Sequence, residues 1–146
     1  MKLPTAAQVI ALHDSLVGRW GGETGFYDHA NGPGSVESAL YTVATAVDAE
    51  QLTIFEAAAL LCAYLLTSHP FLDGNKRTAT ASMLVTLDVN NVALDLKPRA
   101  IFNQIVALQQ GTERAWEKLG RAASPRELVA QLAPWLARHA KRRRRR

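Results

Sequence analysis

The chain has 146 residues, of which 48% are hydrophobic and 21% are charged, as is ordinary for one globular domain with a real core. A single cysteine excludes an intrachain disulfide, and no apolar run reaches the roughly 18–20 residues of a membrane-spanning helix. The net charge is +4, but the last six residues are all cationic, and the rest of the chain carries 11 basic against 13 acidic residues. We therefore expect a near-neutral folded body in the cytoplasm, without membrane contact or a signal peptide.

The charge distribution divides the chain into two parts. Residues 1–140 are expected to form one domain, because no linker or internal repeat interrupts them. The run from Lys141 to Arg146 should form a disordered tail, since like charges repel one another. Such a tail can contact a polyanion non-specifically, and the alternative is that it serves only solubility.

The first helix is marked by a capping box. Thr5 and Gln8 have the T-x-x-Q spacing that opens a helix, here of about 14 residues. The apolar residues expected on one face of this helix are Val9, Leu12 and Leu16. The Gly-rich residues 21–34 should then form a loop.

Two more helices fill the middle of the chain. One is expected over residues 35–47, and the next begins at a second capping box, formed by Thr53 and Glu56. Residues 54–68 are apolar almost all round, which places this third helix in the centre of the core.

The second half of the chain also indicates helices. A helix should begin at Asp73 or Gly74 and end near residues 90–91, and residues 92–97 alternate as a short strand or an extended link does. A further helix is expected from Pro98 until just before Gly111, followed by a short one over residues 112–119.

The strongest helix start combines three signals. Ser124 is a good N-cap, Pro125 suits the first helical position, and Glu127 completes a capping box. Pro134 is expected to kink or interrupt this last helix. The predicted fold class is therefore all-α.

The polar loop SHPFLDGNKRTAT, residues 68–80, lies between two of these helices. His69 ends one helix and can act as a general base, while the next helix offers unpaired N–H groups and a partial positive charge at its start. Gly74 lets the backbone approach an anion closely, and Lys76 and Arg77 add two positive charges that oppose the helix dipole. A bound phosphate explains this placement better than helix formation does.

Two further residues complete the loop. Asp73 is a hard oxygen ligand suited to Mg²⁺ that bridges phosphates, and Phe71 is the apolar residue expected to anchor the loop in the core. Together the loop residues predict a phosphoryl- or nucleotidyl-transfer site. The alternative is a surface turn in which Asp73 caps the helix and the two cations are only solvated.

The stretch HPFLDGNKR, residues 69–77, resembles the Fic/Doc family motif H-P-F-x-[DE]-[GA]-N-[GK]-R over nine consecutive positions. Residues 11–28 and 36–40 resemble the N-terminal part of the Doc branch, the death-on-curing toxins of bacterial toxin–antitoxin pairs. The resemblance implies a single Fic/Doc-type helical domain, with its active-site loop between two core helices.

The resemblance also implies a role for each residue of the motif. His69 would deprotonate a hydroxyl group of a target protein, and Asp73 would hold Mg²⁺. Phe71 would be the buried structural anchor of the loop. The residues that would hold the phosphates of ATP are Gly74, Asn75, Lys76 and Arg77.

Two departures from the AMP-transferring Fic pattern favour the Doc branch. Lys76 replaces a glycine, and Thr80 replaces a distal arginine. Members of the Doc branch transfer the γ-phosphate of ATP to elongation factor Tu, which arrests translation. The resemblance therefore implies a Doc-type Ser/Thr kinase, with AMP transfer and a catalytically silent binding protein as alternatives.

The resemblance has implications for regulation as well. The inhibitory pattern [ST]-x-x-x-E-[GN], which many Fic proteins carry, is not found in this sequence. Restraint by a separate Phd-like antitoxin is expected instead. Outside the loop, His13 and Asp14 are expected to lie on a polar helix edge, and Cys62 is expected to be an inert buried thiol.

Overall fold

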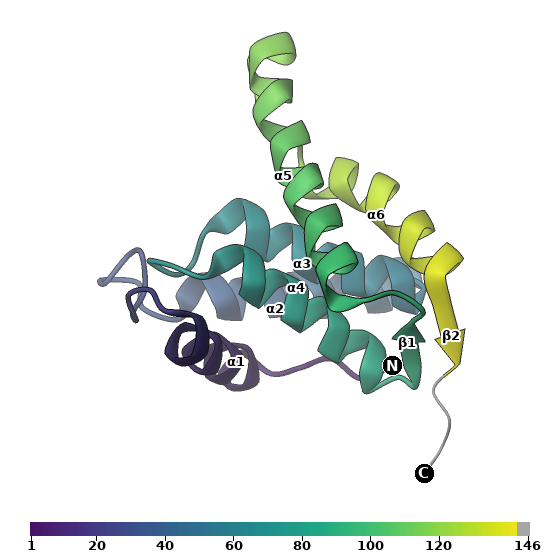
Figure 1. Cartoon of the computed structure of the whole chain (residues 1–146), viewed down its shortest axis with the longest axis horizontal. Coiled ribbons are helices and arrows are strands. Elements are labelled where there is room, and N and C mark those ends of the chain that lie inside the picture. The colour runs from purple at the N-terminus through teal and green to yellow at the C-terminus, as the bar shows by residue number, and fades with distance from the viewer. Residues whose placement is uncertain (143–146) are drawn as a thin grey trace.

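The computed structural model describes residues 1–142, which form a bundle of six α-helices and one small sheet (Figure 1). The helices are α1 (Ala6–Trp20), α2 (Gly34–Glu50), α3 (Ile54–Ser68), α4 (Asn75–Asp88), α5 (Pro98–Leu119) and α6 (Pro125–His139). The strands are β1 (Val92–Leu94) and β2 (Ala140–Arg142). The predicted all-α fold class is confirmed.

Helix α3 lies in the middle of the core and packs against α2, α4 and α6. Its residues from Ala57 to Leu66 are all buried except Tyr64, because the sequence of this helix is apolar on every side. Within residues 1–142, none of the helices has both the length and the apolar character that crossing a membrane requires. The central helix therefore fixes the place of the loop that follows it.

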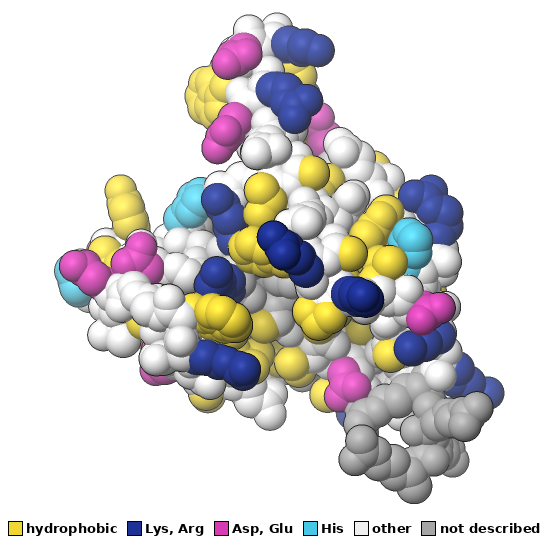
Figure 2. Space-filling view, viewed as in Figure 1, with side chains coloured by type: hydrophobic (Ala, Val, Ile, Leu, Met, Phe, Trp, Pro, Cys, Tyr) yellow, Lys and Arg dark blue, Asp and Glu magenta, His cyan; other side chains and the backbone are white. Residues whose placement is uncertain are grey.

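Helix α5 is continuous, so the predicted break at Gly111 is wrong. A glycine inside a helix costs only about 1 kcal/mol, which the hydrogen bonds of the surrounding turns outweigh. The buried residues of α5, all in its first half, are Ile101, Ile105 and Leu108. The second half projects from the body (Figure 1), and in Figure 2 its tip carries hydrophobic and charged side chains together.

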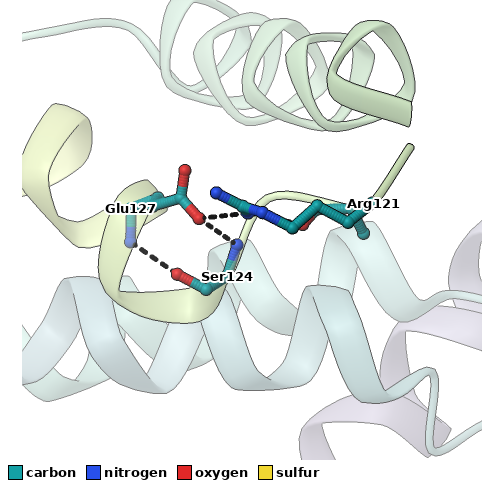
Figure 3. Close-up of polar contacts among 4 residues, drawn as sticks. Arg121, Ser124 and Glu127 are labelled. Carbon is teal, nitrogen blue, oxygen red and sulfur yellow. Dashed lines mark hydrogen bonds and ion pairs between the residues drawn. The ribbon is translucent and has the colours of Figure 1, made fainter. Parts of the chain in front are cut away.

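The start of α6 shows the predicted capping box (Figure 3). The Ser124 hydroxyl accepts a hydrogen bond from the Glu127 N–H at 3.2 Å, and the Ser124 N–H donates to Glu127 Oε1 at 3.1 Å. Arg121 donates to the same Oε1 at 2.6 Å. The pKa of Glu127 is lowered to about 2, first by the Arg121 hydrogen bond and then by those from Ser124. The capping boxes at Thr5 and Thr53 are confirmed as well.

Helix α6 runs through Pro134, so of the two predicted effects, a kink or an interruption, the interruption is wrong. Proline removes one backbone donor from a helix interior, which packing can compensate. Here α6 packs along α3, with Leu128, Leu132 and Leu136 buried at positions four residues apart. The apolar stripe on both sides of the proline therefore holds the helix together.

The end of the described chain is a strand rather than the predicted tail. β2 pairs antiparallel with β1, and Arg142 lies opposite Val92 while Lys141 lies opposite Ala93. Lys141 also forms an ion pair with Asp95 at 3.6 Å. The ordered body thus extends two residues past the boundary predicted at residue 140, and the remainder of the expected tail, 143–146, lies outside the described residues.

Candidate active site

The loop between α3 and α4 places His69 and the start of α4 at one cleft. His69 ends α3 in the left-handed conformation (φ 45°, ψ 59°), and Gly74 precedes α4 with φ 79°. These two reversals turn the chain back within five residues, so both ends of the loop line the same cleft of about 380 Å³. The other lining residues are Leu16, Val17, Gly21, Gly22, Leu66, Leu72, Asp73, Asn75, Lys76, Arg77, Phe102 and Gln109.

Phe71 lies at the centre of the loop and is only 2% exposed. It forms an isolated β-bridge with Phe26, whose ring lies 5.7 Å from the Phe71 ring between centroids. On either side, Leu72 N–H donates to Gly25 O, and Tyr27 N–H donates to Pro70 O. The Gly-rich segment after α1 therefore holds the loop by backbone hydrogen bonds, and the buried Phe71 ring anchors the loop in the core.

Asn75 braces the loop through its side chain. Its Oδ1 accepts from the Phe71 N–H at 3.1 Å, and its Nδ2 donates to the Phe71 carbonyl at 2.9 Å. The amide is therefore engaged within the protein, and the phosphate contact predicted for Asn75 stays a prediction. The Asn75 backbone N–H belongs to the first turn of α4, where helix geometry leaves it without an intrahelical partner.

The alternative interpretation, a surface turn, required Asp73 to cap α4, and Asp73 does not cap it. The N-cap of α4 is Gly74, with no side-chain cap bond, and Asp73 Oδ2 instead accepts from the Glu23 N–H at 2.8 Å. Asp73 lines the cleft, and the structure records no hydrogen bond to its Oδ1 among residues 1–142. Mg²⁺ is commonly held by one or two carboxylates together with substrate phosphates, so Asp73 fits this ion.

Metal binding by the protein alone is not indicated in the described part of the chain. Residues 1–142 contain no group of three or more histidine, cysteine, aspartate or glutamate side chains that could hold an ion. A single carboxylate beside an anion cradle is what a phosphate-borne Mg²⁺ requires, because the phosphates supply further ligands.

The first turn of α4 carries two cations and no acidic residue. Lys76 and Arg77 are both exposed and both line the cleft. The Arg77 guanidinium carbon lies 5.0 Å from the centroid of the Trp20 ring and 5.6 Å from that of Phe102. Two aromatic faces, one from α1 and one from α5, therefore hold this charge at the cleft.

His13 was expected on a polar helix edge, and this expectation is wrong. The residue is completely buried, and its Nε2 lies 2.7 Å from the carbonyl oxygen of Asp73. The buried face of α1 consists of Val9, His13 and Val17 rather than Val9, Leu12 and Leu16. The four-residue spacing of the two valines around His13 was the signal in the sequence that indicates its burial.

Cys62 behaves as the sequence indicates. It lies in α3 with no exposed surface, and burial raises the pKa of its thiol to about 12. A thiolate is therefore absent at neutral pH, and the residue takes no part in the site.

Comparison with known proteins agrees with the motif and the fold. Residues 3–87 match the Fic/DOC family. Over 86 residues the chain is 38% identical to "Protein kinase doc" of Escherichia phage P1. That alignment covers 58% of this chain and 65% of the phage protein, so the chain spans a little less than two thirds of this relative. Because the family match covers more than half of the chain and the whole loop from His69 to Arg77, the protein belongs to the Fic/DOC family.

Proposed function

We propose that the protein is a Doc-like toxin that transfers the γ-phosphate of ATP to a hydroxyl side chain of a target protein. The observation that carries this proposal is that His69 and the amino end of α4 line one cleft. The cleft combines a candidate base, a carboxylate and an anion cradle, which are the parts that phosphoryl transfer needs.

Each residue has a defined task in this reaction. His69 accepts the proton of the target hydroxyl as its oxygen forms a bond to the γ-phosphorus. The bond from that phosphorus to the β–γ bridging oxygen breaks, and ADP leaves. Asp73 would hold Mg²⁺, which neutralises charge on the phosphates when bound. The backbone N–H groups from Gly74 onward, with Lys76 and Arg77, hold the phosphates in place.

The side chains at two positions favour γ-phosphate transfer over AMP transfer. Lys76 occupies the position of a glycine in AMP-transferring relatives, and it lines the cleft. Thr80 occupies the position of a distal arginine, is 6% exposed, and donates its hydroxyl to the Lys76 carbonyl at 2.7 Å. Thr80 therefore adds no cation for a distant phosphate.

The proposed partners follow from the family resemblance. Elongation factor Tu is the proposed target, with arrest of translation in the cytoplasm as the consequence. A Phd-like antitoxin is the proposed inhibitor. The similarity to a phage protein named as a protein kinase supports the kinase activity in the same way.

Parallel reactions with ATP labelled at either the γ- or the α-phosphate test the proposal, with Mg²⁺ and purified elongation factor Tu present. Label from the γ-phosphate alone is expected on the target, and it should be lost in His69→Ala. His29→Ala is a matched control, because His29 is also exposed but does not line the cleft. Label from the α-phosphate would indicate AMP transfer, and no label from either would favour a protein that only binds.

A further inference from the structure

A buried histidine on α1 reaches the peptide that joins the candidate metal ligand to α4. The His13 ring stacks on Phe71, with 3.7 Å between centroids and 6° between planes. Its Nε2 lies 2.7 Å from Asp73 O, and its Nδ1 lies 3.0 Å from Asp14 Oδ1. The His13 side chain is only 1% exposed, whereas the Asp14 side chain is 60% exposed. The ring therefore connects α1 to the loop between α3 and α4.

The partner of Nε2 fixes the direction of this hydrogen bond. A carbonyl oxygen can only accept, so Nε2 carries hydrogen and His13 donates to Asp73. The described peptide bonds are all trans, and the C=O and N–H of a trans peptide point in opposite directions. A carbonyl turned toward His13 thus turns the N–H of Gly74 away from His13, at a residue that lines the cleft.

The space around Asp73 leaves few alternative positions for it. A Cβ atom added to Gly22 would lie 3.1 Å from the Asp73 Cβ, and one added to Gly74 would lie 3.5 Å from the His13 ring. The carboxylate is held on one side by the Glu23 N–H, and the carbonyl is held on the other by His13. Both halves of Asp73 are therefore tied to the segment of chain from α1 to the loop after it.

We infer that His13 is a positioning residue, which orients the Asp73 carboxylate toward Mg²⁺ and the Gly74 N–H toward phosphate by donating from Nε2 to the Asp73 carbonyl. In this role His13 itself contacts neither the Mg²⁺ nor the phosphate. That Asp73 binds Mg²⁺ and Gly74 binds phosphate rests on the proposed function. That His13 orients the loop does not depend on it. Groups that orient a metal ligand typically change metal affinity or activity by roughly 10- to 100-fold when they are removed.

A pair of amide variants separates this hydrogen bond from simple packing. The side-chain nitrogen of His13→Gln reaches the place of Nε2, whereas that of His13→Asn reaches only the place of Nδ1. Both variants lose the ring that stacks on Phe71, so both should lose stability to a similar degree. We expect the Gln variant to keep the Mg²⁺ dependence of ATP binding close to wild type. The Asn variant should need roughly 10- to 100-fold more Mg²⁺.

Backbone amide NMR signals of Gly74 and Asn75 give a readout without ATP. They should shift in His13→Asn and return toward their wild-type positions in His13→Gln. Equal behaviour of the two variants in both measurements would overturn the inference. If the wild type transfers no phosphate at all, the proposed function fails, and these amide signals still decide the role of His13.

The wild-type protein provides a test that needs no variant. With histidine labelled by nitrogen-15, the His13 Nε2 should carry hydrogen and couple to the Asp73 carbonyl. An Nε2 without hydrogen would overturn the inference, because the nitrogen would then have nothing to donate to a carbonyl oxygen.

Discussion

The side-chain amide of Asn75 is hydrogen bonded at both ends to the backbone of Phe71, at 3.1 Å and 2.9 Å. Asn75→Ala removes both bonds and leaves two backbone groups of Phe71 without these partners. We expect the free energy of unfolding to fall by about 1–3 kcal/mol in urea denaturation. Asn103→Ala, at an exposed position on α5, should change it by no more than about 0.5 kcal/mol. Equal effects of the two substitutions would contradict the bracing role.

Trp20 and Trp116 provide a matched pair for testing the Arg77 contact. Their exposed fractions are 61% and 59%, but only Trp20 lies under the Arg77 guanidinium. Trp20→Ala removes one of the two aromatic faces at Arg77, an interaction of about 0.5–1 kcal/mol at exposed sites. We expect ATP to bind more weakly to Trp20→Ala in calorimetric titration, and Trp116→Ala to bind it as the wild type does. An unchanged affinity in Trp20→Ala would show that this ring does not position Arg77.

Gly111 and Gly120 are expected to respond to alanine in opposite ways. Gly111 lies inside α5 with open space where a Cβ would be, so Gly111→Ala should raise the free energy of unfolding by about 0.5–1 kcal/mol. Gly120 ends α5 with φ 67°, a conformation that costs alanine energy, so Gly120→Ala should lower stability. Thermal denaturation of both variants checks the prediction. Destabilisation by Gly111→Ala would indicate that α5 is not continuous there.

The low pKa of Glu127 predicts how its contribution depends on pH. The pKa is about 2 in the folded protein, against 4.5 for the ordinary group, so Glu127 stabilises the fold fully above pH 4.5. That contribution is lost as the pH falls from 4.5 toward 2, because the carboxylate becomes protonated. Glu127→Gln should therefore melt below the wild type near pH 7, and the difference should shrink as the pH falls through this range. A difference in melting temperature that does not change with pH would contradict the role of the charge.

Much of the fold was predictable because its signals are local. The capping boxes at Thr5, Thr53 and Ser124 depend on residues three positions apart, and each begins a helix in the structure. The motif residues 69–77 likewise span one short loop and the first turn of α4, so their sequence alone indicates that His69 and Gly74 meet at one site. The apolar character of residues 54–68 correctly placed α3 in the core.

The features that were missed depend on contacts between distant segments. His13 lies 60 positions before Asp73 along the chain, and no local sequence pattern indicates that its Nε2 donates a hydrogen bond to the Asp73 carbonyl. The pairing of Arg142 with Val92 joins residues that are close only in the folded protein. Gly111 was misjudged for a different reason, since a modest local preference was overridden by the helix around it.

Binding of ATP with Mg²⁺, followed by amide NMR signals, tests the central claim most directly. The account predicts that the signals of Gly74, Asn75, Lys76 and Arg77 shift first and most as ATP is added. His69→Ala should still bind ATP, because His69 serves the transfer step rather than phosphate binding. If millimolar ATP with Mg²⁺ left these four signals unmoved, the claim that this cleft holds the phosphates would be contradicted.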